Sequence, residues 1–373
     1  MQTVPRQLLH AFSTFKLGGP QARFVELANA FGPQFQHQIV AMDGCFDAGE
    51  RLNPDVVWQP VRLPNHRGGG LANRSAFRTV LSDLQPDLLL TYNWGAIEWT
   101  AANFPRRVPQ VHVEDGFGAD EALRQLPRRV WTRRLLLGLT RTPVVVASRH
   151  LEQLATEVWR LPSHQVRFFP NGVDLPSELP IPRLVDTQKP LVVGTVSGLR
   201  PEKNIARLVR AFAALRLQQA AHLVVVGDGP ERPALEALAE SLGIQADVEF
   251  MGYQANPLAI LPRFDLFALS SNTEQLPIAM LEAMAWGVPV VATRVGDVAL
   301  VLPTLCQVAL AEPEDAAFER ALLRVVGLRQ DWPSWIEANR RQVRQFYSKN
   351  IMLNMWQKVF DGQIGLAFAN RTG

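Results

Sequence analysis

The chain has 373 residues, of which 47% are hydrophobic and 20% are charged, and its formal net charge at pH 7 is +3. This composition describes an ordered globular protein, and the length suits two domains better than one core. So small a net charge gives no argument for nucleic-acid binding. Its two cysteines, Cys45 and Cys306, lie far apart and form neither a disulfide framework nor a metal motif, which favours a reducing compartment.

The beginning of the chain shows no targeting signal. Residues 1–6 lack the apolar core of a signal peptide, and no apolar run approaches the roughly 20 residues that a membrane-spanning helix needs. We therefore expect a cytoplasmic protein that is at most peripheral on the inner face of a membrane.

Short apolar runs alternate with helical patterns through the first 174 residues, which we expect to form one domain. Helices are expected at residues 21–30 and from His150 onward. The expected strands are residues 8–14, 37–43, 56–63, 87–92, 110–113, 143–147 and 166–169.

A pair of glycines, Gly18 and Gly19, follows the first expected strand and opens a helix. Glycines at such a junction allow a ligand to approach the backbone closely. The pair is not part of a G-x-G-x-x-G fingerprint, so dinucleotide binding is not supported. The alternative is a tight turn without a ligand.

Three polar residues lie at the end of the strand expected at residues 110–113. His112 and Glu114 share one face because side chains alternate along a strand, and Asp115 follows at the strand's end. Ligands of open parallel sheets bind at the carboxyl ends of strands, so all three are candidate site residues. Each could instead be a satisfied structural residue.

Residues 127–137 combine arginines with an apolar side. A helix of this kind can lie on anionic lipid, and the candidate contact residues are Arg128, Arg129, Trp131, Arg133 and Arg134. The alternative is a helix whose leucines face the core and whose arginines are solvated.

Residues 175–189 are rich in proline, lack periodicity and are expected to form a linker. The alternation then restarts over residues 190–349, with an amphipathic segment at 351–360. Repeated strand–helix units predict an α/β protein with two Rossmann-like domains, whose parallel sheets face a cleft between them. The second set of expected strands is residues 191–196, 221–226, 248–251, 266–269, 290–293 and 307–310.

The loop after the first strand of the second domain carries Gly194, Arg200 and Lys203 and precedes a helix expected at 205–215. Small residues let a ligand approach the backbone. Two fixed cations would stabilise the charge that develops on a departing diphosphate. The alternative is an ordinary surface loop. Further along, Gly227 and Gly229 are expected to serve turn geometry.

Two glutamates, Glu274 and Glu282, flank the start of a helix for which we expect Pro277 at the first position. The N–H groups of a helix start suit a phosphate, and carboxylates beside them suit ligand hydroxyls. A diphosphate flanked by two sugars would fit. Spacing alone would also be compatible with two solvated surface charges.

The stretch from Glu274 to Val291, together with Arg200 and Lys203, resembles the retaining nucleotide-sugar glycosyltransferases of group 1 (family 4-like), which have the two-domain GT-B fold. Where that family usually has Gly or Ser followed by Phe, this chain has Gln275 and Leu276. The difference lies near the donor sugar, so the resemblance does not identify the sugar.

The resemblance implies a role for each matching residue. Arg200 and Lys203 would hold the diphosphate, Glu282 the ribose and Glu274 the donor sugar, while Asp115 or Glu114 would touch the transferred sugar. A last helix, at about residues 350–373, would pack back on the first domain. The implied donor-binding set is Gly18, Gly19, Gly194, Arg200, Lys203, Met251, Tyr253, Glu274, Gln275, Leu276, Pro277 and Glu282.

The expected function is retaining transfer of a sugar from a nucleotide diphosphate-sugar to a saccharide or lipid-linked acceptor, in cell-surface polysaccharide or glycolipid synthesis. No Asp-x-Asp pair, zinc spacing, P-loop or G-x-S-x-G motif is present, so we expect no metal or other cofactor. A sugar-nucleotide epimerase of similar fold and a non-catalytic regulatory subunit are the alternatives. An epimerase would convert the donor without an acceptor.

Overall fold

The computed structural model describes residues 5–63, 71–117, 121, 125–176 and 189–363. The chain forms two compact units, Met1–Pro170 with Met352–Gly373, and Asn171–Ile351. Residues 177–188 of the expected linker lie outside the described part of the chain.

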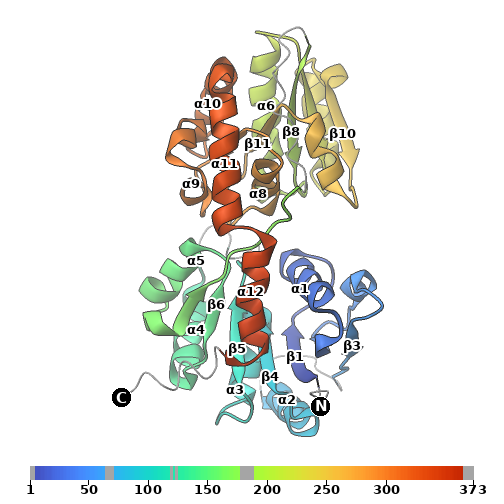
Figure 1. The fold of residues 1–373 in the computed structure, drawn as a ribbon, viewed down its shortest axis with the longest axis vertical. Coiled ribbons are helices and arrows are strands. Elements are labelled where there is room, and N and C mark those ends of the chain that lie inside the picture. The colour runs from blue at the N-terminus through green and yellow to red at the C-terminus, as the bar shows by residue number, and fades with distance from the viewer. Residues whose placement is uncertain (1–4, 64–70, 118–120, 122–124, 177–188, 364–373) are drawn as a thin grey trace. The chain divides into compact units, whose positions relative to one another are not determined.

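The first unit is built on a seven-stranded parallel sheet with the order β3-β2-β1-β4-β5-β6-β7 (Figure 1). The chain runs from β1 outward to β3 and then returns to β4 on the other side of β1. The strands are β1 (Arg6–Phe12), β2 (Phe35–Ala41), β3 (Val57–Pro60), β4 (Leu88–Tyr92), β5 (Gln110–Glu114), β6 (Val144–Val146) and β7 (Val166–Phe168). The helices are α1 (Gly19–Phe31), α2 (Leu71–Leu84), α3 (Glu98–Ala102), α4 (Pro127–Thr140) and α5 (Arg149–Gln153).

Both faces of this sheet are covered, because successive side chains of a strand point to opposite sides. Leu8 and Phe12 of β1 pack in one cluster with residues of α1. Leu9 and Ala11 of the same strand pack in a second cluster with residues of α2 and α3. The near-continuous apolar strands of the sequence are therefore buried on both sides.

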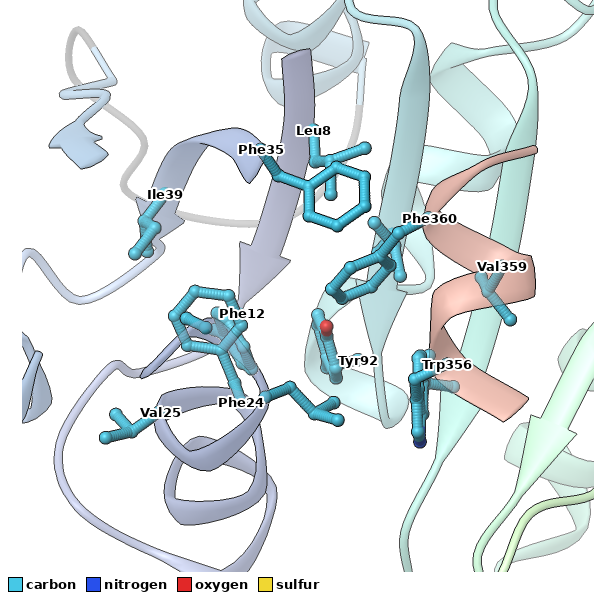
Figure 2. Packing of buried hydrophobic residues seen from close by; sticks show 14 of the residues in the cluster. Leu8, Phe12, Phe24, Val25, Phe35, Ile39, Tyr92, Trp356, Val359 and Phe360 are labelled. Carbon is cyan, nitrogen blue, oxygen red and sulfur yellow. The ribbon is translucent and has the colours of Figure 1, made fainter. Parts of the chain in front are cut away.

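The last helix, α12 (Lys349–Phe360), completes the core of the first unit. Its buried side chains Met352, Trp356, Val359 and Phe360 belong to the same cluster as β1 and α1. Figure 2 shows the Phe360 ring among side chains of this cluster, and its centroid lies 5.2 Å from that of Phe35. The first unit therefore includes a segment from the end of the chain.

The second unit has a six-stranded parallel sheet with the order β10-β9-β8-β11-β12-β13 (Figure 1). Its strands are β8 (Leu191–Val196), β9 (Ala221–Val226), β10 (Val248–Gly252), β11 (Leu266–Leu269), β12 (Val290–Thr293) and β13 (Leu310–Ala311). Its helices are α6 (Ile205–Arg216), α7 (Arg232–Ser241), α8 (Ile278–Ala285), α9 (Val298–Val301), α10 (Asp315–Gly327) and α11 (Trp332–Phe346). Helix α6 packs against α10, and α8 packs against α11.

Four of the strands expected in this unit, β8, β9, β11 and β12, have the bounds that the sequence predicted. The strand expected at 307–310 is wrong, because Thr304–Ala309 is a 3-10 helix and β13 begins only at Leu310. The amide of Gln307 donates to the carbonyls of Ala299 and Leu302, both at 2.8 Å. These hydrogen bonds tie the segment to α9 and favour the helical turn.

Within the described residues, no helix is both long enough and apolar enough to span a membrane.

Candidate active site

In the second unit, the loops after β8 and β11 meet at the carboxyl edge of the sheet. These two strands are neighbours in the sheet although β9 and β10 lie between them in the sequence. Strand order reverses at this point, and open parallel sheets bind ligands where it reverses. Arg200 and Lys203 follow β8, and Glu274 follows β11.

Lys203 and Glu274 form an ion pair at this edge, with 2.7 Å between Nζ and Oε1. The hydroxyl of Ser271 donates to the same carboxylate oxygen, also at 2.7 Å. The two ion-paired side chains are only 19% and 9% exposed, so water screens them weakly. Within the described residues, no group donates to Oε2 of Glu274, which leaves that oxygen able to accept from a ligand hydroxyl.

The two loops are held together by hydrogen bonds. The side chain of Asn204 caps α6 by accepting from the N–H of Arg207 at 3.2 Å. The side-chain oxygen of Asn272 accepts from Asn204 at 3.2 Å and from the Arg207 guanidinium at 2.9 Å. Arg207 is itself buried and also binds the carbonyl of Ser270. These contacts fix the backbone on which Lys203 and Glu274 sit.

Two glycines, Gly296 and Gly194, allow close packing in this region, and the role of Gly194 differs from the one expected from the sequence. A Cβ on Gly296, whose φ is +50°, would lie 2.2 Å from the carbonyl oxygen of Glu274, so only glycine fits there. Gly194 was expected to give a ligand room to approach. It lies instead within β8, where a Cβ would lie 2.3 Å from the ring of Phe264. The smallness of Gly194 therefore serves core packing, and its contact with a donor stays a prediction.

The segment after Glu274 leads directly into α8. Pro277 is the N-cap residue rather than the first helical residue, and Glu282 lies half-buried on the second turn. The carbonyl of Gln275 accepts from the N–H of Asp297 at 2.9 Å. The side chains of Leu276 and Pro277 are buried, so this pair packs inward.

Three other predicted donor residues lie at or near the carboxyl ends of β8 and β10. Arg200 follows β8, is 58% exposed and pairs with Glu202 at 3.0 Å. Met251 lies in β10, half-buried, with its sulfur 3.5 Å from a guanidinium nitrogen of Arg263. Tyr253 follows β10 and is exposed. Arg200 therefore forms an exposed ion pair, whereas Lys203 forms a mostly buried one.

The first unit has a cavity of about 460 Å³ at the equivalent edge of its own sheet. Its walls come from the loops after β1, β4 and β5, from the start of α1 and from α4, and β1 and β4 flank the reversal of strand order. The lining residues are Ser13, Pro20, Asn93, Trp94, Gly95, Asp115, Gly116, Phe117, Arg129 and Arg133.

Asp115 lines this cavity, and an arginine holds its carboxylate. Arg23 of α1 contacts both carboxylate oxygens, with 2.9 Å between Nη2 and Oδ2. Burial raises the pKa of the Asp115 carboxyl above its usual value, and the charge of Arg23 opposes that rise. The backbone N–H of Asp115 donates to the side-chain oxygen of Asn93 at 2.7 Å.

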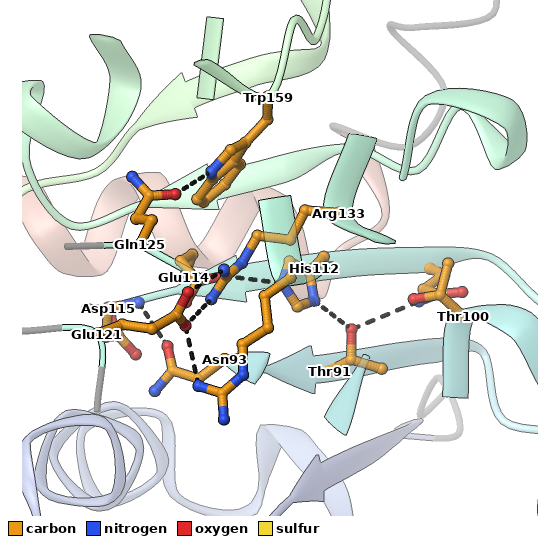
Figure 3. A network of polar contacts seen from close by, with 12 residues as sticks. Thr91, Asn93, Thr100, His112, Glu114, Asp115, Glu121, Gln125, Arg133 and Trp159 are labelled. Carbon is orange, nitrogen blue, oxygen red and sulfur yellow. Dashed lines mark hydrogen bonds and ion pairs between the residues drawn. The ribbon is translucent and has the colours of Figure 1, made fainter. Parts of the chain in front are cut away.

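His112 and Glu114 lie behind the cavity rather than in it. Both side chains are fully buried, and neither lines the cavity. His112 contacts the hydroxyl of Thr91 at 2.9 Å and Glu114 at 3.5 Å, within the network of Figure 3. A ligand in the cavity would therefore meet Asp115 rather than Glu114, the other residue expected to touch the transferred sugar.

Arg133 is a buried structural residue, not a membrane contact. Its guanidinium donates to Glu114 at 3.2 Å and to Glu121 at 3.2 Å (Figure 3), and it lies 4.9 Å over the ring of Trp159. Arg129 is mostly buried and also pairs with Glu121, at 3.0 Å. The expectation that these two arginines meet lipid headgroups is wrong, because Arg133 is fully buried, Arg129 is mostly buried, and both are paired with the buried carboxylate of Glu121.

The outer face of α4 keeps the remaining residues of the predicted basic patch. Arg128 and Arg134 are exposed, and the Arg134 guanidinium lies 5.2 Å over the ring of Trp131. Trp131, Leu135 and Leu139 are also exposed, Leu139 by 75%. Tryptophan, leucine and arginine thus share one solvent-facing side of the helix.

The glycine pair lies at the start of α1. Gly18 is the N-cap residue, in extended conformation, and Gly19 is the first helical residue. A Cβ on Gly19 would meet nothing within 4 Å in the described part of the chain, so none of these neighbours requires glycine there.

Several residues of the two sites were not predicted from the sequence: Ser13, Arg23, Asn93, Trp94, Glu121 and Ser271. One signal was present for Arg23, which lies next to Phe24 and near Leu27 on the buried side of α1. A charge at such a position predicts a buried partner. Among the described residues, no group of three or more His, Cys, Asp or Glu side chains could hold a metal ion.

Comparison with known protein families agrees with this geometry. The glycosyl transferases group 1 model matches residues 181–342, and the glycosyltransferase family 4 model matches residues 17–176. The chain is 30% identical over 330 residues to a GDP-mannose-dependent alpha-mannosyltransferase of Mycolicibacterium smegmatis, which covers 84% of this chain and 80% of that protein. The chain belongs to the group 1 glycosyltransferases.

Other curated relatives match this glycosyltransferase over shorter stretches. It is 40% identical over 103 residues to N-acetyl-alpha-D-glucosaminyl L-malate synthase of Bacillus anthracis, covering 28% of this chain and 27% of that protein. It is 37% identical over 103 residues to the lipopolysaccharide core biosynthesis glycosyltransferase LpsE of Rhizobium meliloti, covering 28% of this chain and 29% of that protein. Less than a third of each of these two relatives is therefore matched.

Solved structures show the fold of this glycosyltransferase. Anabaena Alr3699/HepE in complex with UDP superposes with a TM-score of 0.78 at 19% identity, covering 96% of this chain and 100% of that one. WaaG, a glycosyltransferase involved in lipopolysaccharide biosynthesis, superposes with a TM-score of 0.67 at 16% identity, covering 95% and 100%. The GT-B fold expected from the sequence is confirmed.

Proposed function

We propose that this chain transfers a sugar, with retention of anomeric configuration, from a nucleoside diphosphate-sugar to a saccharide acceptor. The observation that carries the proposal is the Lys203–Glu274 ion pair at the strand-order reversal of the second unit, with Glu282 on the adjoining helix α8. A cation and two carboxylates match a ligand that has a diphosphate between two hydroxyl-bearing rings.

Donor binding would replace the carboxylate partners of Arg200 and Lys203 with the diphosphate of the donor. In this structure Lys203 pairs with Glu274 and Arg200 pairs with Glu202. A diphosphate would draw both cations to itself and leave Glu274, still held by Ser271, to accept from sugar hydroxyls. Neighbouring solved structures of this fold contain UDP and UDP-glucose, which supports a donor of this class.

The chemical step requires no nucleophile from the protein. The acceptor hydroxyl oxygen forms a bond to the anomeric carbon on the face from which the diphosphate departs. The bond from that carbon to the phosphate oxygen breaks with its electron pair, and the departing oxygen takes the hydroxyl proton. Fixed cations at Arg200 and Lys203 would stabilise the charge that grows on the leaving group.

The cavity of the first unit is the proposed acceptor site, with Asp115 as the carboxylate that faces the ligand. Relatives named for lipopolysaccharide core biosynthesis support an acceptor in cell-surface polysaccharide or glycolipid synthesis. The exposed face of α4, with Arg128, Trp131 and Arg134, has the character of a helix that lies on an anionic membrane surface, where a lipid-linked acceptor would be found.

The test is to incubate the full chain with UDP-, GDP- and ADP-sugars and to measure thermal stabilisation and release of the nucleoside diphosphate. We expect one nucleotide to raise the unfolding temperature and its sugar to be transferred to added saccharides with retention, as NMR of the product would show. Conversion of the donor without an acceptor would instead indicate an epimerase. Absence of stabilisation by any nucleotide-sugar would contradict the proposal.

A further inference from the structure

Among the described residues, the charges that line the cavity of the first unit are all compensated. The charged residues that line it are Asp115, Arg129 and Arg133. Each is paired with a charge of opposite sign, and the partners are Arg23, Glu121 and Glu114. With histidine counted as neutral, these residues supply three positive and three negative charges, so the described part of the cavity wall has no net charge.

The short distances in these ion pairs determine how strongly the cavity can attract a charged ligand. Arg129 and Arg133 share the carboxylate of Glu121 at 3.0 and 3.2 Å. Arg133 and Glu114 are both fully buried, so their mutual attraction is weakly screened. Cations held in this way already have their strongest partners, and an anionic ligand would also face the Asp115 carboxylate.

We infer that this cavity binds an uncharged sugar ring and discriminates against phosphorylated or uronic-acid sugars. The inference rests on the proposed function for the identity of the ligand as a saccharide acceptor. Its charge selectivity follows from the six paired residues, because an entering anion would meet arginines whose charge is already neutralised and would lie beside the Asp115 carboxylate.

The rest of the lining suits a neutral, hydroxyl-rich ligand. The side-chain oxygen of Asn93 accepts from the backbone N–H of Asp115. The NH₂ group of Asn93 therefore points away from that N–H and can donate to a ligand. Ser13 is exposed and can both donate and accept. Trp94 and Phe117 are half-buried and offer carbon surface to the C–H groups of a sugar ring. Gly95 lets the loop after β4 pack closely against the loop after β1, since a Cβ there would lie 2.3 Å from Cβ of Ser13.

Binding of two matched probes to the full chain would test the inference. Saturation-transfer NMR would compare methyl α-D-glucopyranoside with glucose 6-phosphate at low ionic strength, where electrostatic effects are largest. We expect the neutral probe to bind at least about tenfold more tightly. We expect Trp94→Ala to weaken it. Equal binding of the two probes, preference for the phosphate, or no binding of either would overturn the inference.

Charge variants would reverse the preference if it arises as argued. Ser13→Lys adds a cation to the exposed wall, and Glu121→Gln removes the carboxylate shared by Arg129 and Arg133. Both are expected to gain salt-sensitive binding of glucose 6-phosphate. Ser13→Lys is the decisive variant because it leaves every buried pair intact. Glu240→Gln, an exposed residue on α7, makes the same charge change outside the cavity and should leave both affinities unchanged.

Failure of this inference is separable from failure of the proposed function. Donor binding is read independently, as thermal stabilisation by nucleotide-sugars. A protein that binds donor but prefers the phosphorylated probe would refute only the charge selectivity. A protein that binds the neutral probe but no nucleotide-sugar would refute only the transferase proposal.

Discussion

Arg23 holds the carboxylate of Asp115 through both of its terminal nitrogens, while its guanidinium lies 5.0 Å over the ring of Trp356. The contact joins three parts of the first unit: helix α1, the end of β5 and the last helix α12. Asp115 lines the cavity, so Trp356 of the last helix contacts the arginine that holds a residue of the proposed acceptor site.

We predict that Arg23→Gln destabilises the protein by about 3–5 kcal/mol, because it leaves a buried carboxylate without its counter-charge. Loss of the cation also raises the pKa of Asp115 further, because the charge of Arg23 opposes the rise that burial causes. Urea unfolding would measure the first effect. The double variant Arg23→Gln/Asp115→Asn should recover most of the stability, since it buries no unpaired charge. A single variant as stable as the parent would show that the pair contributes nothing.

Removing either donor-site cation should lower turnover by roughly 10²-fold or more, the scale for loss of one preorganised electrostatic group. The two variants should differ in stability. Arg200→Ala removes an exposed side chain and should leave the unfolding temperature unchanged. Lys203→Ala leaves the mostly buried Glu274 without its cation and should lower that temperature. Steady-state kinetics and thermal unfolding would measure both, with Glu202→Gln as a control that keeps both cations. Near-parental turnover in both alanine variants would refute the phosphate-binding role.

Sugar transfer is expected to be independent of metal ions, because Arg200 and Lys203 could neutralise the diphosphate and the sequence has no Asp-x-Asp pair. Turnover in excess EDTA should equal turnover with added magnesium or manganese. Loss of activity in EDTA that either ion restores would contradict this expectation.

Stability should fall in mild acid because of a buried histidine pair. Nε2 of His10 lies 3.0 Å from Nδ1 of His37, burial lowers the pKa of His37 to about 4, and burial also lowers that of His10. The unfolded chain takes up protons near the ordinary histidine pKa of about 6.5, so stability present above that pH is lost as the pH falls toward 4. His37 alone should account for about 2 kcal/mol between pH 7 and pH 4.5.

The free energy of unfolding in urea at those two pH values would measure this effect. His37→Leu should reduce the difference between them, whereas His164→Gln, at an exposed histidine, should leave it as in the parent. An unchanged pH dependence in His37→Leu would show that the buried pair does not cause the acid sensitivity.

Membrane binding, if α4 provides it, should depend on the exposed residues of that helix. Arg128→Gln and Arg134→Gln should each weaken binding to anionic liposomes by about 1 kcal/mol, and salt should reduce the effect. Trp131→Ser should remove a contribution that salt does not affect. Arg133→Gln should instead destabilise the fold, because Arg133 is buried between Glu114 and Glu121.

Sedimentation with anionic and neutral liposomes at low and high salt would measure the binding. Negligible binding of the parent protein to both lipids would leave Arg128 and Arg134 as solvated charges.

The sequence alone determined the features that depend on local patterns. Short apolar runs predicted the bounds of β8, β9, β11 and β12, because a strand buried on both faces is mostly apolar. The Glu274–Glu282 segment and the loop with Arg200 and Lys203 were recognised from residues close together in the chain. The two-domain fold followed from the alternation of strands and helices.

Only the tertiary structure decided which distant residues meet and which arginines face water. Lys203 and Glu274 are 71 residues apart and Arg23 and Asp115 are 92 apart. Each pair forms because parallel strands place their loops, and the helices that begin there, at one edge of a sheet. Arg128 and Arg133 look alike in sequence, yet one is exposed and the other buried. The difference arises because Glu114 and Glu121, supplied by other segments, compensate the charge of Arg133, and no pattern within α4 records that partnership.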